Sequence, residues 1–121
     1  MIAVDDSEDI LTLLKIGFRN FPDIELNTFT SGQAALNAMA EKNLDLIILD
    51  VLMPEITGPD LYNEIRKIDK LRTTPIFFLT ALDDESEVGG LLQSGASGIL
   101  KKPFFPKKIA QEILDAWKAL K

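Results

Sequence analysis

Neither cysteine nor histidine occurs among the 121 residues of this chain. Without cysteine there is no disulfide framework and no thiolate metal site. Without histidine the chain lacks the commonest general base and the commonest transition-metal ligand, and it cannot itself carry a phosphohistidine. Any chemistry performed by this protein must therefore use carboxylates, hydroxyls and lysines.

Long apolar runs and an excess of positive charge are also missing. No apolar run approaches the roughly 20 residues of a membrane-spanning helix, and the first residues do not resemble a signal peptide. The net charge of −6 argues against a nucleic-acid-binding surface. With 46% hydrophobic residues, the sequence predicts one cytoplasmic domain over residues 1–121, with no direct contact to nucleic acid or membrane.

Apolar segments alternate with amphipathic segments, and short loops join them. This alternation predicts an α/β fold, in which right-handed crossovers give a five-stranded parallel sheet with helices on both faces. The predicted strands are 1–4, 24–29, 44–50, 76–79 and 98–100. The predicted helices begin near Ser7, Thr30, Thr57, Asp83 and Pro106.

Local signals define several of these helices. Asp6 or Ser7 can cap the first helix, and the stretch Thr30–Gln33 reads as a capping box for the second. Gly89 and Gly90 weaken the fourth helix by roughly 1 kcal/mol each relative to alanine. The predicted inner face of the last helix consists of Ile109, Ile113, Leu114, Trp117 and Leu120.

Polar residues that stand at the carboxyl ends of the predicted strands are the candidate site, because ligands of such sheets bind there. They are Asp5 and Asp6, Asp50, Thr80 and Lys102. Converging carboxylates repel one another unless a cation neutralises them, and Mg²⁺ prefers such oxygen ligands. An ionised aspartate can also attack a phosphorus centre and form an acyl phosphate.

Each of these residues has an ordinary structural alternative when it is taken alone. Asp5 or Asp6 is more often a helix cap, Thr80 a strand-end hydroxyl, and a Lys–Pro pair simply part of the surface. Asp50 is equally well explained as a cap or as a reactive group. Their joint placement at strand ends favours the functional interpretation. A second acidic cluster, Asp83, Asp84 and Glu85, is best explained as a solvated helix start, and Phe104–Phe105 as packing with Phe105 partly exposed.

The same residues carry a resemblance to a known family, and it covers essentially the whole chain. The motifs are Val4-Asp5-Asp6, Leu49-Asp50-Val51-Leu52-Met53-Pro54 with Gly58, Leu79-Thr80-Ala81, and Gly95-Ala96 followed by Lys102-Pro103-Phe104. In this order and spacing they resemble the response-regulator receiver domain. The resemblance implies a doubly wound (βα)5 fold with the flavodoxin-like strand order 2-1-3-4-5, of which the chemotaxis receiver is a known example.

The resemblance also implies roles for individual residues. Asp50 would accept a phosphoryl group. Mg²⁺ would be bound by Asp50, by Asp6 directly, by Asp5 mostly through water, and by the backbone carbonyl of Leu52.

Further implied roles concern the neighbouring strand ends. Lys102 would contact a phosphoryl oxygen and precede a cis peptide bond to Pro103, whereas Lys101 would point elsewhere. Thr80 would move toward the phosphoryl group and carry the following loop with it.

The implied function is that of a phosphorylation switch in two-component signal transduction, not an enzyme with a separate substrate. A sensor histidine kinase or phosphotransfer protein would be the donor. A downstream protein or output domain would contact the fourth helix, fifth strand and fifth helix. The alternatives are a pseudo-receiver that acts only as an interaction module, and an aspartyl-phosphate phosphatase. The sequence does not identify the kinase or the output. It also leaves open the oligomeric state, for which a homodimer is one option, and the extent of the full protein.

Two features depart from the family pattern, one at Ile99 and one at Leu52 and Leu82. Ile99 replaces the aromatic residue that usually stands three positions before the key lysine, so an aromatic rotamer switch cannot report activation here. We expect the loop after Thr80 and the Gly89–Gly90 helix to do so instead. Leu52 and Leu82 occupy positions near the expected path of the hydrolytic water and cannot orient it, which predicts a long-lived phosphoryl group.

Overall fold

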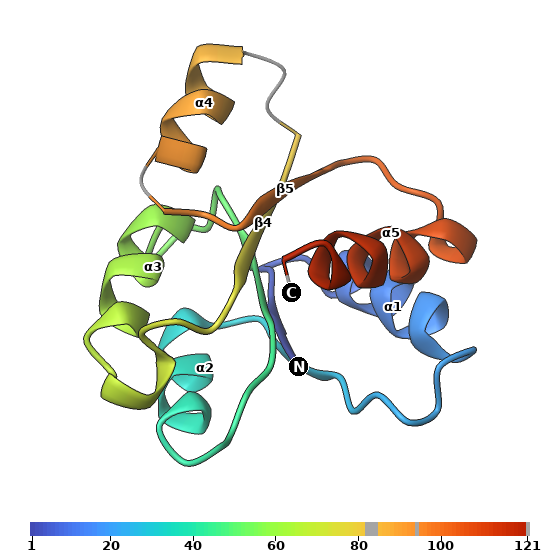
Figure 1. Cartoon of the computed structure of the whole chain (residues 1–121), viewed down its shortest axis with the longest axis horizontal. Helices are drawn as coiled ribbons and strands as arrows, with labels where there is room; N and C mark the ends of the chain where they lie inside the picture. Colours follow the sequence, from blue (N-terminus) through green and yellow to red (C-terminus); the bar gives the residue numbers. More distant parts are fainter. Residues whose placement is uncertain (82–84, 94, 121) are drawn as a thin grey trace.

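The computed structural model describes residues 1–81, 85–93 and 95–120 as one α/β domain (Figure 1). Strands and helices alternate along the chain, as the sequence predicted. The strands are β1 (Ile2–Val4), β2 (Asn27–Phe29), β3 (Ile47–Asp50), β4 (Ile76–Thr80) and β5 (Gly98–Lys101). The helices are α1 (Glu8–Phe18), α2 (Gly32–Met39), α3 (Gly58–Arg66), the short 3₁₀ helix η1 (Asp69–Leu71), α4 (Glu85–Gln93) and α5 (Pro106–Lys118).

All five strands are parallel, and their order in the sheet is β2-β1-β3-β4-β5. This is the order that the family resemblance implied. β1 and β3 are neighbours, with Val4 opposite Leu49, and β3 and β4 are neighbours, with Asp50 opposite Leu79. The carboxyl ends of these three strands therefore meet at one edge of the sheet.

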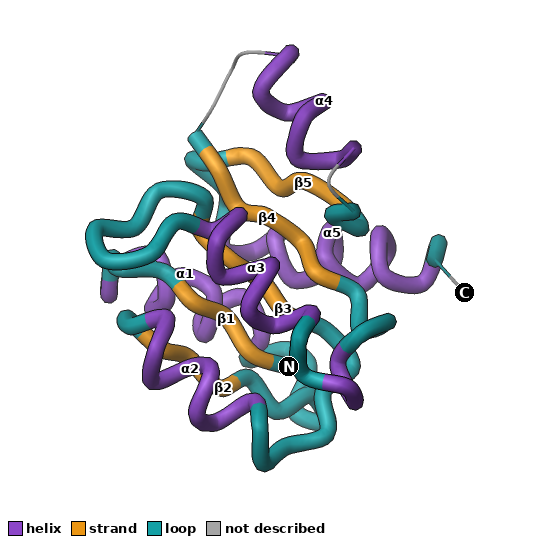
Figure 2. Tube along the Cα trace, turned by 90° about the vertical axis from the view of Figure 1, so that its left-hand side faces the viewer, coloured by secondary structure: helices purple, strands orange, loops and turns teal. Residues whose placement is uncertain are grey.

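Two helical layers cover the sheet (Figure 1). α1 and α5 pack together on one face, and α2, α3 and α4 lie on the other, which is the nearer face in Figure 2. Side chains alternate along each strand, so Phe77 joins the α1/α5 core whereas Phe78 joins the core beneath α2, α3 and α4. Because both faces are covered, the central strands are continuously apolar.

The strands β2 and β3 are shorter than the sequence suggested. β1 has only three residues, so β2 pairs with it only between Asn27 and Phe29. β3 begins at Ile47, which is the first position with strand partners on both sides. Apolar character extends beyond both strands because the flanking residues still pack against the cores.

Two local predictions about helices are wrong. Ser31, not Thr30, caps α2 by accepting a hydrogen bond from the Ala34 N–H, and Gln33 donates forward to Asn37 at 3.1 Å instead of reaching back. Leu120 lies beyond the end of α5 and is exposed, because the helix stops at Lys118 before Leu120 can reach the sheet. Within the described residues, no helix is long and apolar enough to cross a membrane.

Gly58 allows the loop after β3 to fold tightly over the end of that strand. Its N–H donates to the Val51 carbonyl at 2.8 Å. A Cβ atom at this position would collide with the Asp50 carbonyl oxygen and lie 2.9 Å from the Val51 Cα and 3.0 Å from the Phe78 ring. Two of these neighbours are backbone atoms, which cannot move aside cheaply.

We expect Gly58→Ala to destabilise the protein by about 1–3 kcal/mol, because the added methyl group overpacks this contact. Gly90→Ala is the matched control: a Cβ at Gly90 meets no described atom within 4 Å, and the change removes a helix-weakening glycine, which should stabilise by about 0.5–1 kcal/mol. Urea denaturation of both variants measures the difference. Equal effects of the two substitutions would contradict the packing explanation.

Candidate functional site

Three carboxylates converge at the carboxyl edge of the sheet. Asp5 and Asp6 directly follow β1, and Asp50 ends β3, the neighbouring strand. One oxygen from each of the three side chains lies within 4.8 Å of the others. Asp5 and Asp50 are almost completely buried, at 1% and 5% exposure, whereas Asp6 is exposed. The adjacency of β1 and β3 thus creates a concentrated negative charge.

Short local hydrogen bonds orient Asp5. Its Oδ1 accepts from the Ser7 N–H at 2.9 Å, and its own N–H donates to the Phe29 carbonyl of β2 at 3.1 Å. Ser7 in turn caps α1 by accepting from the Ile10 N–H at 3.4 Å. Ser7 is therefore the helix cap, and the second carboxylate oxygen of Asp5 stays directed at the cluster. The ordinary capping role does not explain Asp5 or Asp6.

Lys102 supplies the neighbouring positive charge. Its Nζ lies 2.8 Å from Asp5 Oδ2 and 3.1 Å from Asp50 Oδ1, and the Lys102 side chain is 17% exposed. Asp5 Oδ2 lies within ion-pair distance of the Lys102 ammonium, but the geometry of this pair is not that of a hydrogen bond. The peptide bond from Lys102 to Pro103 is cis, as predicted. It is thus Lys102, and not the exposed Lys101, that reaches the carboxylates.

Thr80 ends β4 beside this cluster. Asp50 is opposite Leu79 in the ladder, so Thr80 lies one residue beyond it, and Thr80 is 2% exposed. The Lys102 N–H donates to the Thr80 carbonyl at 2.8 Å. This bond ties the end of β4 to the loop that carries the Lys102 ammonium.

Burial and like charge act together on the Asp50 carboxyl. Desolvation by burial, together with the nearby Asp5 and Asp6 carboxyls, raises the pKa of Asp50 from 3.8 to about 6, although Lys102 opposes this shift. Burial alone would lower the pKa of Lys102, but its contacts with Asp5 and Asp50 outweigh burial, so the pKa is raised. Lys102 is therefore firmly cationic, and one ammonium does not fully compensate the cluster.

The donor set fits a hard divalent cation. Three carboxylate oxygens lie within 4.8 Å of one another, and Lys102 offsets their charge only in part, since the pKa of Asp50 is still raised. Magnesium prefers oxygen ligands and keeps several waters, which suits a cluster with one exposed member, Asp6. The residues that could hold such an ion are Asp5, Asp6 and Asp50.

Comparison with known proteins connects this arrangement to a family. Residues 1–114 match the family model described as the response regulator receiver domain. The chain belongs to this family. The sequence resemblance is thereby confirmed, together with the five-stranded receiver fold.

Individual relatives support the assignment of the chain as a receiver domain. It is 32% identical to the response regulator SaeR of Staphylococcus aureus over 113 residues, 93% of this chain and 48% of the relative. The chain thus spans about half the length of the curated relatives it matches.

Solved receiver structures superpose closely on this one. Chemotaxis response regulator CheY4 of Vibrio cholerae has a TM-score of 0.86 and 30% identity over 95% of both chains. The receiver domain of sensor histidine kinase PA1611 of Pseudomonas aeruginosa has a TM-score of 0.82 and 26% identity, covering 98% of this chain and 95% of that one. The latter structure has a magnesium ion coordinated in its active-site cleft.

The carboxyl edge of the sheet thus brings together the predicted side chains of Asp5, Asp6, Asp50 and Lys102, with Thr80 at the adjacent strand end. Sequence reasoning missed the role of Ser7 as the donor that orients Asp5; a serine two residues after a strand-end aspartate was the available signal.

Other predicted positions are not members of the carboxylate cluster or lie outside the described residues. Ile99 is partly buried against the core beneath α2, α3 and α4, the Leu52 side chain is 67% exposed, and Phe105 is 73% exposed, more than predicted. Leu82, Asp83, Asp84 and the Glu85 side chain lie outside the described residues.

The raised pKa of Asp50 predicts a pH-dependent stability difference. Between pH 3.8 and about 6 the folded state retains a proton that the unfolded state has lost, so this group makes stability fall as pH rises through that window. In metal-free buffer, Asp50→Asn should therefore stabilise the receiver at pH 7.5 by about 1–2 kcal/mol. This free energy is smaller than the value that the full pKa shift of Asp50 corresponds to, because solvent at the cleft screens the charge.

At pH 4 most of the gain from Asp50→Asn should be lost, because folded Asp50 is then almost fully protonated and the unfolded carboxyl, near its ordinary pKa of 3.8, is only about half ionised. Denaturation curves of the wild type and Asp50→Asn at the two pH values measure this gain in stability. Exposed Asp23→Asn is the matched control. A stability gain that is the same at pH 4 and pH 7.5 would contradict the assigned shift.

Proposed function

We propose that this receiver domain is a magnesium-dependent phosphorylation switch whose phosphoryl acceptor is Asp50. The observation that carries the proposal is the ion-paired cluster: Lys102 Nζ lies 3.1 Å from Asp50 Oδ1 and 2.8 Å from Asp5 Oδ2, at the edge where Asp6 and Thr80 also stand. A cluster of this kind provides a nucleophile, a cation site and a fixed positive charge together.

The proposed reaction transfers a phosphoryl group from a phosphohistidine donor. A carboxylate oxygen of Asp50 forms a bond to phosphorus as the phosphorus–nitrogen bond of the donor breaks, and the imidazole leaves with the electron pair of that bond. The product is an acyl phosphate. Asp50 requires no general base because its ionised form is the nucleophile, and the chemistry needs mainly positioning and charge neutralisation.

The other residues of the site neutralise and position charge in this proposal. Magnesium bound by Asp5, Asp6, Asp50 and the Leu52 carbonyl would neutralise charge on the phosphoryl oxygens. Lys102 would follow the new negative charge away from Asp5, and buried Thr80 would offer its hydroxyl to a phosphoryl oxygen.

The added charge then biases a two-state equilibrium of the domain. The Lys102 N–H bond to the Thr80 carbonyl links such a movement to β5. The proposed partners are a sensor histidine kinase or phosphotransfer protein and, on the α4, β5 and α5 face, a downstream protein or output domain. A cytoplasmic location and the single-domain extent over residues 1–121 stay predictions.

The two alternatives are less well supported. A pseudo-receiver would not require the buried Asp50–Lys102 pair, and a phosphatase of the aspartyl-phosphate type would require a second acid where Leu52 stands. We therefore propose that the domain catalyses only its own phosphorylation and dephosphorylation.

Incubation with Mg²⁺ and acetyl phosphate should add one phosphoryl group, about 80 Da by intact mass, to the wild-type domain and none to Asp50→Asn. That mass is the sum of one phosphorus, three oxygens and one hydrogen. Chelation of the metal should abolish the addition, and Lys102→Gln should reduce it, because the charge of the cluster is then left uncompensated. Addition to Asp50→Asn would refute the assignment of the acceptor, absence of addition to the wild type would support the pseudo-receiver, and continuous phosphate release would support the phosphatase.

The phosphoryl group should be long-lived because apolar Leu52 cannot orient an attacking water. We expect Leu52→Asn to accelerate its loss about fivefold, since one net hydrogen bond is worth about 1 kcal/mol. Decay of the phosphorylated mass in metal-containing buffer measures the rate. Exposed Leu120→Asn on the far side of the domain is the matched control. Equal decay rates of wild type and Leu52→Asn would contradict this explanation.

A further inference from the structure

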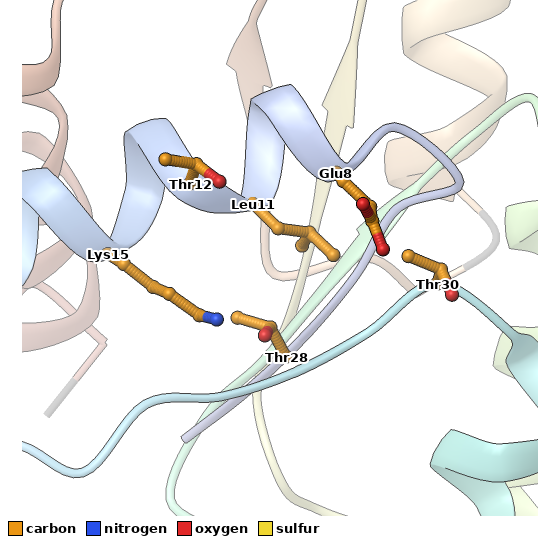
Figure 3. A pocket seen from close by; sticks show the side chains of 6 residues that line it. All are labelled: Glu8, Leu11, Thr12, Lys15, Thr28 and Thr30. Carbon is orange, nitrogen blue, oxygen red and sulfur yellow. The ribbon is translucent and has the colours of Figure 1, made fainter.

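A polar groove with a volume of about 360 Å³ lies between α1 and the edge strand β2 (Figure 3). It is separate from the Asp50 cluster, and none of the roles proposed above uses it. Its floor is buried Leu11, and its walls carry hydroxyl groups and two opposite charges. The lining residues are Glu8, Leu11, Thr12, Lys15, Thr28 and Thr30.

The groove exists because two helices cover five strands on this face. α1 and α5 pack against each other, and β2 is the last strand on its side of the sheet, so none of the described helices lies beside the outer side of α1 there. Along β2, Phe29 packs into the opposite core, whereas Thr28 and Thr30 line the groove. Alternation along the strand thus directs hydroxyl-bearing side chains toward α1.

The two charges stand at opposite ends of the groove. Glu8 and Lys15 are seven residues apart, which places them on the same face of α1 with a rise of about 10.5 Å between them. Glu8 points toward Thr30 and Lys15 toward Thr28 (Figure 3). In the chain as described, neither charge forms an ion pair with another residue.

We propose that this groove binds a short zwitterionic peptide. The two charged side chains start about 10.5 Å apart along α1, so one bound peptide can meet both with its two termini. Its terminal ammonium would pair with Glu8 and its terminal carboxylate with Lys15. Threonine hydroxyls both donate and accept hydrogen bonds, so Thr12, Thr28 and Thr30 suit the peptide N–H and C=O groups.

Simpler ligands fit the groove less well. A lone anion would be repelled by Glu8, and a lone cation would be repelled by Lys15. The volume is at the small end of the range for ligand sites. The proposal goes beyond the phosphorylation switch and does not require it, because the binding residues and Asp50 are different.

The test is a titration of the unphosphorylated, ¹⁵N-labelled domain with triglycine. The amide chemical shifts of the protein report binding at each peptide concentration. Shifts confined to residues around Thr12, Thr28 and Thr30 are expected at millimolar peptide. Glu8→Gln and Lys15→Gln should each weaken binding about fivefold, because each removes one charge-assisted contact at a solvent-exposed site. The spectra also verify that both variants are folded.

Matched charge removals elsewhere should leave binding unchanged: Glu112→Gln on α5 and Lys67→Gln at the C-cap of α3, both of which are exposed. Glycine and the doubly blocked N-acetyl-triglycine amide should bind at least about fivefold more weakly than triglycine, because they lack one or both bridging contacts. The proposal is overturned if triglycine shifts no resonance of the groove, if the blocked peptide binds as tightly, or if the control variants weaken binding as much as Glu8→Gln and Lys15→Gln.

Discussion

One ammonium group beside three carboxylates is the interaction on which the functional edge of this receiver domain depends. Lys102 Nζ contacts both Asp5 and Asp50, the two buried members of the cluster. It reduces their mutual repulsion without removing it, and the pKa of Asp50 is accordingly raised to about 6. The folded state therefore retains a site with unbalanced negative charge, which favours a bound cation and, in our proposal, phosphoryl transfer.

Backbone groups hold this cluster in place. Ser7 holds one oxygen of Asp5, the Lys102 N–H is bonded to the Thr80 carbonyl, and Gly58 lets the loop after β3 lie against the Asp50 backbone. The Phe78 ring lies beside Gly58 and pairs with the Tyr62 ring at 6.1 Å between centroids. Packing beneath α3 is thus directly connected to the backbone of the proposed acceptor.

Much of the fold was predictable because its signals are local and repeated. Continuous apolar runs predicted the central strands, and the alternation of strands and helices predicted a parallel sheet covered on both faces. Predictions failed where a local pattern competed with tertiary pairing. β2 is shortened to Asn27–Phe29 because β1 offers only three partners, Ser31 replaces Thr30 as the cap of α2, and Leu120 lies past the end of α5.

The sequence by itself determined which residues stand at the strand ends, because chain order and apolar periodicity place Asp5, Asp50 and Lys102 there. Only the tertiary structure decided which of their atoms meet, since the adjacency of β1 and β3 and the path of the loop after β5 are non-local. It also decided the existence of the groove between α1 and β2. Glu8 and Lys15 are ordinary surface charges in sequence, and they line a groove because none of the described helices covers the outer side of α1 beside the edge strand.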